Sequence, residues 1–142
     1  MTSYLVDVNV WVALAVVEHD HHDAALDWFI QLGQDDAVVL CRVTQMGFLR
    51  LLTNRRILAD DVLTAPEAWR TYDTWASLAG ANFALEPPGF EHTWRDMTQH
   101  PNTGPNFWTD AYLAAFAKAG GYTVVSFDRG FKQHNVALRL LI

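Results

Sequence analysis

Tyr4-Leu5-Val6-Asp7-Val8-Asn9 is the stretch that decides the fold. It begins as a short, continuous apolar run, which is typical of a β-strand buried on both faces. The run stops at an acid, Asp7, and an amide follows two residues later. In open α/β sheets, ligands bind beyond the carboxyl ends of the strands. We therefore expect Asp7 to belong to a functional site, together with later residues that reach the same edge of the sheet.

Length and composition predict one globular domain over residues 1–142, because 51% of the residues are hydrophobic and can fill a single core. No apolar run is long enough to span a membrane, and the N-terminus lacks the basic start of a signal peptide. The lone cysteine, Cys41, has no partner for an internal disulfide, so we expect a cytoplasmic protein. A net charge of −6 argues against binding nucleic acid through the overall field. Any such activity must come from a local site.

Strands and helices are predicted to alternate along the chain. Residues 37–41 and 122–127 have the composition of buried strands, and shorter strands are expected at 82–86 and 136–141. Thr44 is the expected N-cap of a helix that buries Met46. A capping box from Thr64 to Glu67 opens a helix that buries Trp69. Alternation of this kind favours an α/β fold with a mostly parallel central sheet and helices on both faces.

Two later aspartates are expected to join Asp7. Asp128 directly follows the strand at 122–127, so a parallel sheet brings it to the same edge. Asp110 lies one turn into an alanine-rich helix predicted for 107–118. Three carboxylates about 5 Å apart would repel by roughly 3 kcal/mol per pair, and Mg²⁺ or Mn²⁺ relieves such repulsion. The pattern therefore predicts a metal site that can hold a phosphodiester and activate water.

A simpler interpretation stands beside this one. An aspartate at a strand-to-helix turn is often only an N-cap, and Asp7 and Asp128 both fit that description. Asp110 does not, because it stands inside its helix. The three acids together favour the metal site.

At these residues the sequence resembles the PIN domain, and within it the VapC-type toxin ribonucleases of bacterial toxin–antitoxin pairs. The resemblance covers essentially the whole chain and implies a three-layer α/β fold. It further implies a metal-dependent endoribonuclease, a hydrolase that cleaves RNA phosphodiesters with water activated by Mg²⁺ or Mn²⁺. A cognate antitoxin would inhibit it, and homodimers are common in the family. The resemblance rests on Leu5-Val6-Asp7-Val8-Asn9-Val10, on residues 108–115 and on residues 124–131.

Carried over by position, the resemblance makes Asp7, Asp110 and Asp128 the catalytic acids and metal ligands. Asn9 and Ser126 would be polar supports that orient them. The family usually carries a glutamate at the start of the helix after the second strand, and the matching place here is predicted to hold Gln45. An amide can still position a water but brings no charge, which weakens the case for a second metal ion. Glu18 is an alternative source of a carboxylate.

Three further residues are candidates for binding substrate: Arg42 and Arg50 for phosphates or the antitoxin, and Trp108 for stacking on a base. Solvated helix ends and ordinary packing explain them equally well. His19, His21 and His22 do not converge at their i, i+2, i+3 spacing, so we assign them no metal.

Two rival functions remain open at the level of sequence. A catalytically weak PIN-like module that binds RNA or a protein partner would explain Gln45. A receiver-like signalling domain expects paired acids after the first strand, whereas Val8 follows Asp7. The sequence does not distinguish RNA from DNA as the substrate, because no motif in it is known to bind the 2′-hydroxyl group of RNA.

Overall fold

The computed structural model describes residues 1–101 and 104–142. Its centre is a five-stranded sheet in the order β3-β2-β1-β4-β5, and every strand pair is parallel. The first strand therefore lies in the middle of the sheet, with its carboxyl end at the shared edge, as the sequence predicted. The strands are β1 (Ser3–Val6), β2 (Ala37–Leu40), β3 (Asn82–Phe83), β4 (Thr123–Ser126) and β5 (Leu138–Leu140).

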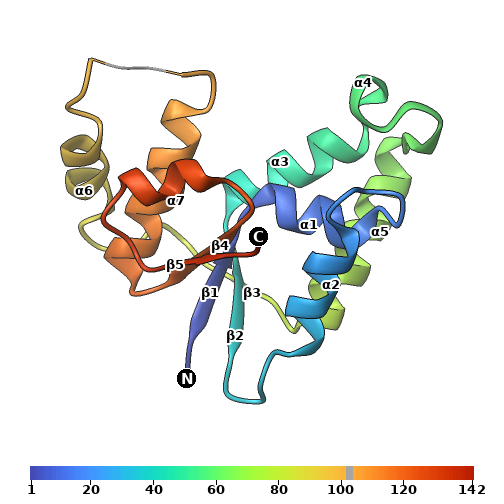
Figure 1. Cartoon of the computed structure of the whole chain (residues 1–142), viewed down its shortest axis with the longest axis horizontal. Coiled ribbons are helices and arrows are strands. Elements are labelled where there is room, and N and C mark those ends of the chain that lie inside the picture. The colour runs from blue at the N-terminus through green and yellow to red at the C-terminus, as the bar shows by residue number, and fades with distance from the viewer. Residues whose placement is uncertain (102–103) are drawn as a thin grey trace.

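Helices cover both faces of the sheet, which gives the three layers of an α/β fold (Figure 1). The helices α1, α2, α3 and α5 lie on one side, and α6 and α7 lie on the other. The α-helices are α1 (Val8–Ala15), α2 (His22–Ile30), α3 (Arg42–Leu52), α4 (Arg55–Leu58), α5 (Ala65–Ala79), α6 (Phe90–Met97) and α7 (Phe107–Gly120). Short 3₁₀ helices span Ala59–Asp61 and Arg129–Gln133 (η2). No helix in the described residues is long and apolar enough to cross a membrane.

Two hydrophobic cores result from the alternation of side chains along the central strands. Val6 and Val125 face the core formed with α1, α2, α3 and α5. Leu5 and Val124 face the core formed with α6 and α7. Successive strand residues point to opposite faces, so a strand covered on both sides must be apolar throughout. This requirement explains the continuous apolar run before Asp7.

The start of α3 differs from the prediction. Cys41, not Thr44, is the N-cap: Thr44 is the third residue of the helix, its Oγ1 accepts from the Cys41 N–H at 3.0 Å and its hydroxyl donates to the Cys41 carbonyl at 2.9 Å. The buried face also differs from the prediction: Phe48 is fully buried and Met46 is 51% exposed.

The helix α5 begins as predicted. The Thr64 hydroxyl accepts from the Glu67 N–H, and the Glu67 carboxylate accepts from the Thr64 N–H. The inward position is Ala68, however, and Trp69 is 48% exposed. Here the cap was predicted correctly and the buried face was not.

Candidate active site

Asp7 lies between the end of β1 and the start of α1. Its Oδ1 accepts from the Val8 N–H at 2.7 Å, which makes it the N-cap of α1. Its Oδ2 accepts from the Ser126 hydroxyl at 2.7 Å. Ser126 at the end of the neighbouring strand β4 thus fixes the carboxylate that caps α1. Both interpretations of Asp7, as a helix cap and as part of a site at the sheet edge, are compatible with this geometry.

Ser126 is fully buried and connects three segments of the chain. Besides donating to Asp7, its Oγ accepts from the Asp128 backbone N–H at 2.9 Å and from the Asn9 side-chain amide at 3.4 Å. The Asn9 amide oxygen also lies 3.5 Å from the Phe127 backbone nitrogen, which donates to it. Ser126 therefore bonds directly to two of the acids, whereas Asn9 is connected to them through Ser126.

Asp128 and Asp110 arrive from separate elements. Asp128 caps η2 through a hydrogen bond from the Gly130 N–H to its Oδ1 at 2.8 Å. Asp110 stands in the first turn of α7, where its backbone N–H donates to the Asn106 carbonyl at 2.9 Å. As predicted, the helix position brings Asp110 to the edge of the sheet where the other two acids lie.

One cavity of about 280 Å³ is lined by all three acids. Its walls come from α1, α3, α7 and the end of β4, that is, from both helical layers. The remaining lining residues are Val8, Asn9, Val43, Gly47, Arg50, Leu51, Asn106, Thr109 and Leu113.

Burial and neighbouring carboxylates raise the pKa values of Asp110 and Asp7. Burial raises the pKa of Asp110 to about 7, with further contributions from the charge of Asp128, a hydrogen bond between these two carboxyl groups and the charge of Asp7. Burial also raises the pKa of Asp7, partly offset by the hydrogen bonds from Ser126 and Val8. Within residues 1–101 and 104–142, none of the three acids forms an ion pair. The carboxylates thus converge without a salt bridge to a cation in the described residues, although Arg50 lines the same cavity.

The donor set fits a small, hard cation. As the side chains stand, no group of three or more His, Cys, Asp or Glu residues in the described part of the chain is arranged to hold a metal ion. Mg²⁺ does not need three, because it usually binds through one or two carboxylates and keeps several waters. Both oxygens of Asp7 and one of Asp128 already accept hydrogen bonds. Asp110 and Asp128, whose carboxyl groups lie within hydrogen-bonding distance of each other, are therefore the part of the site best able to hold an ion.

The raised pKa of Asp110 predicts how stability depends on pH. Because this pKa rises from 3.8 to about 7 on folding, the folded state binds more protons between these values, and metal-free stability falls as pH increases across that window. Asp110 is only half-buried, so after allowance for solvent screening we expect a loss of about 1–2 kcal/mol. Urea unfolding in EDTA at pH 5 and pH 8 measures it. Asp110→Asn should flatten the profile, and an equally steep profile in the variant would contradict this origin.

Gln45 does not line the acid cavity. Its Oε1 accepts from the Arg42 guanidinium, which also lies 4.6 Å over the Phe83 ring. The positions of α3 that line the acid cavity are 43, 47, 50 and 51. The supporting role of Gln45 stays a prediction, but a carboxylate at position 45 would stand outside the lining.

Gly47 is the residue that sequence reasoning missed. A Cβ at this position would lie 2.7 Å from Cγ2 of Val8, so α1 and α3 approach each other too closely here for any other residue without a shift. The helical spacing of Val43, Gly47 and Arg50 is the signal that could have identified this face. None of the α3 residues that line the cavity carries a carboxylate.

The three substrate candidates separate in space. Arg50 lines the acid cavity and is the one cation in that lining. Arg42 lies over Phe83 instead. Trp108 is 57% exposed and packs edge-on against Trp94 and Phe107, outside the cavity lining. Of these three candidates, Arg50 alone lines the acid cavity.

The model of the PIN-domain family matches residues 4–136. The chain belongs to the PIN-domain family. This PIN domain is 42% identical to ribonuclease VapC41 of Mycobacterium tuberculosis, over 96% of this chain and 97% of that protein. It is 30% identical to ribonuclease VapC29 of the same organism, over 99% and 96%. The resemblance to VapC ribonucleases inferred from the sequence is thereby confirmed.

Solved structures confirm the fold. VapC20 of Mycobacterium tuberculosis, a toxin that cleaves the sarcin–ricin loop, superposes on this PIN domain with a TM-score of 0.71 at 20% identity, covering 94% of this chain and 96% of that one. VapBC2 from Rickettsia felis, bound to a DNA fragment from its promoter, gives a TM-score of 0.73 at 13% identity, covering 98% of both chains. These likenesses support the three-layer α/β architecture.

Proposed function

We propose that this chain is a VapC-type endoribonuclease that hydrolyses RNA phosphodiesters at the cavity formed by Asp7, Asp110 and Asp128, with Mg²⁺ or Mn²⁺ as its cofactor. The observation that carries the proposal is the convergence of these acids in one cavity, with raised pKa values for Asp7 and Asp110 and no ion-pair partner for any of the three in the described chain. The 42% identity of this chain to ribonuclease VapC41 supports the same function.

The acids, Ser126 and Arg50 have distinct roles in the proposed reaction. Asp110 and Asp128 would hold the ion, with Asp7 beside them. The bound ion supplies a Lewis acid for the phosphate and lowers the pKa of water. Ser126 fixes Asp7 and the backbone of Asp128 together, and its hydroxyl favours the ionised form of Asp7. Arg50 is placed to pair with a phosphate oxygen of the RNA.

A cognate antitoxin is the proposed protein partner, and a cytoplasmic homodimer of single-domain subunits is the proposed state. Solved structures of the same fold include VapBC2 from Rickettsia felis and VapBC-1 from nontypeable Haemophilus influenzae, which supports a partner of this kind. The exposed apolar side chains Val17, Ile57 and Trp69 offer surface for such contacts.

The test is RNA cleavage by the purified protein, free of antitoxin, with Mg²⁺, with Mn²⁺ and with EDTA. Calorimetric titration with Mn²⁺ provides a readout that does not depend on activity. Metal binding together with cleavage that EDTA abolishes is the expected result. A folded protein that neither binds Mn²⁺ nor cuts RNA would favour the alternative, a PIN-like module that binds RNA or a protein partner, for which the absence of a carboxylate from α3 in the cavity is the supporting observation.

Removing the Ser126 hydroxyl should slow cleavage more than it harms the fold. Ser126→Ala leaves Oδ2 of Asp7, the Asp128 N–H and the Asn9 amide without their common partner. Loss of a residue that orients metal ligands typically costs about 10- to 100-fold in affinity or activity. Cleavage rates and Mn²⁺ affinity measure this, with the exposed Ser77→Ala on α5 as the control. Unchanged Mn²⁺ affinity and rate would refute the orienting role.

A further inference from the structure

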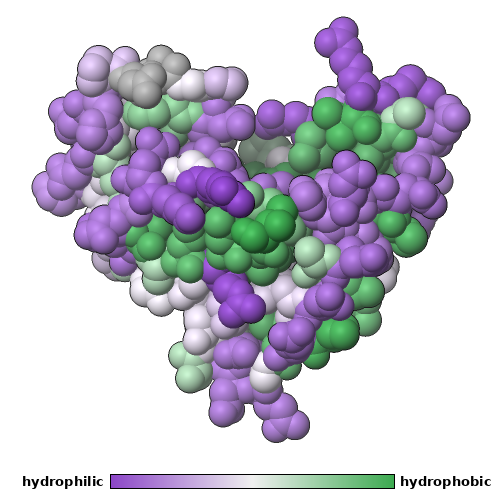
Figure 2. All heavy atoms as spheres, in the orientation of Figure 1, coloured by the Kyte–Doolittle hydropathy of each residue, from purple (hydrophilic) through white to green (hydrophobic). Residues whose placement is uncertain are grey.

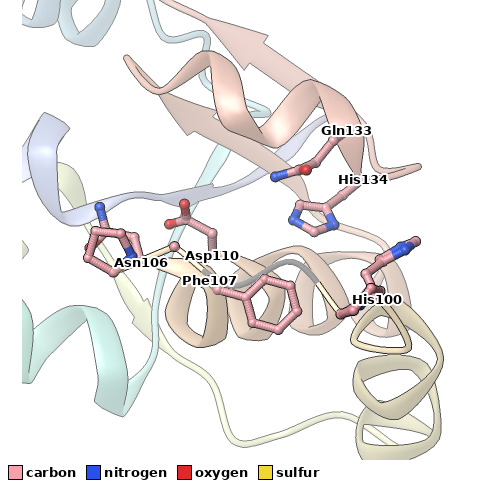
Figure 3. A pocket seen from close by; sticks show the side chains of 9 residues that line it. His100, Asn106, Phe107, Asp110, Gln133 and His134 are labelled. Carbon is pink, nitrogen blue, oxygen red and sulfur yellow. The ribbon is translucent and has the colours of Figure 1, made fainter.

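A second cavity, of about 550 Å³, opens next to the acids. Asn106 and Asp110 line both cavities, so Asp110 stands in the wall between them. Figure 3 shows the arrangement: Gln133 and His134 come from the segment around η2, and Phe107 from the start of α7 lies across from them. Its volume lies within the range of pockets that bind small organic ligands, roughly 300–1,000 Å³.

The lining of this cavity suits a heterocyclic base better than a phosphate. Phe107 and His134 present ring faces on which a flat ring can stack. Gln133 and Asn106 offer both donors and acceptors for the edge of a base. Among the described residues, no lysine or arginine contributes to the lining, and its one carboxylate there is Asp110 of the proposed active site.

We propose that this second cavity receives one unpaired nucleobase of the RNA, from the nucleotide beside the phosphodiester that is cut. The proposal rests on the proposed function and adds a determinant of substrate choice to it. In this arrangement the RNA phosphate would lie in the acid cavity and the base of the adjoining nucleotide in the second cavity, on the other side of Asp110. A base can enter such a pocket only when it is unpaired, so the substrate class is single-stranded RNA or a loop. Phe107, Gln133 and His134 would then select the base at one position.

The experiment is cleavage of a random single-stranded RNA pool with Mg²⁺, followed by sequencing of the new ends. We expect the wild type to prefer certain bases at one position beside the cut. Phe107→Leu keeps an apolar side chain but removes the aromatic face, and should reduce that preference about ten-fold. His134→Ala and Gln133→Ala should change which base is preferred. Phe107→Tyr, which retains a ring, should restore the preference.

Two matched variants control for indirect effects. Phe29→Leu alters a half-buried phenylalanine of α2 that packs on Trp75, and His92→Ala alters an exposed histidine of α6 paired with Asp96. Both should keep the wild-type preference. A wild type that cuts with a clear preference, unaltered by the Phe107, Gln133 and His134 variants, would overturn the base pocket and leave the nuclease standing.

A binding measurement separates the base pocket from the nuclease. Titration of AMP, GMP, CMP and UMP in EDTA, followed by the NMR signals of the His134 and Phe107 rings, should shift these signals for at least one nucleotide and spare His92. Absence of any shift up to millimolar concentration would overturn the pocket whether or not the protein cuts RNA. Shifts in a protein that does not cut would overturn the proposed nuclease and retain the base site.

Discussion

Replacing Asp110 by asparagine should lower the rate of RNA cleavage at least about 100-fold while the protein stays folded. Asparagine has nearly the same shape, so the first turn of α7 is preserved, but the charge that would hold the ion is lost. The variant should also be more stable than wild type in EDTA at pH 8, because burial and the neighbouring acids disfavour the Asp110 carboxylate. Loss of activity accompanied by a gain in stability is the pattern expected of a functional residue rather than a structural one.

Cleavage assays and urea unfolding of the same protein samples measure both halves of this prediction. Asp27→Asn, on the exposed side of α2, is the matched control and should leave both quantities unchanged. Asp7→Asn should also lower activity, although it disturbs the hydrogen bond from Ser126 as well. An Asp110→Asn variant that cuts RNA at the wild-type rate would exclude Asp110 from the catalytic site.

Truncating Phe48 to alanine should destabilise the fold by about 3–5 kcal/mol. Phe48 belongs to α3 and is fully buried against α1 and α5. The centre of its ring lies 6.0 Å from that of Trp11 and 6.4 Å from that of Tyr72. The loss combines the buried apolar surface with the cavity left behind. Because α1 carries Asp7 at its N-terminus and packs closely on α3 at Gly47, the same change should also loosen the active site.

Urea unfolding measures the loss at Phe48. Phe48→Leu should cost clearly less than Phe48→Ala, because it fills most of the space. Phe83→Ala is the control on a 41% exposed phenylalanine and should cost less than about 1 kcal/mol. Equal losses at the two phenylalanines would show that the Trp11–Phe48 contact is not central to the core.

Much of the architecture could be predicted from the sequence because it depends on local and repeating signals. A continuous apolar run such as 4–6 must be covered on both faces, and alternating strands and helices lead to parallel pairing. Parallel pairing then brings the carboxyl ends of β1 and β4 together. Asp7 and Asp128 therefore share an edge, and the sequence predicted that Asp110 would face it.

Other features depended on contacts between distant segments. Ser126 was predicted as a support, but its simultaneous bonds to Asp7, Asp128 and Asn9 exist only once β1, β4 and α1 are assembled. The cavity beyond Asp110 likewise needs α7 and η2 side by side, although Phe107 and His134 lie far apart in the sequence.

The sequence by itself determined the type and order of the five strands and of the main helices, and the edge of the sheet at which the acids meet; α4 and the 3₁₀ helix after it were not predicted. The tertiary structure alone decided which faces α3 and α5 turn to the core. Successive side chains of a helix are rotated by about 100°, and on α3 the packing of Phe48 against Trp11 and Tyr72 selects the face that is buried, which leaves Met46 exposed. The same orientation of α3 leaves Gln45 outside the lining of the acid cavity and brings Gly47 and Arg50 to its wall.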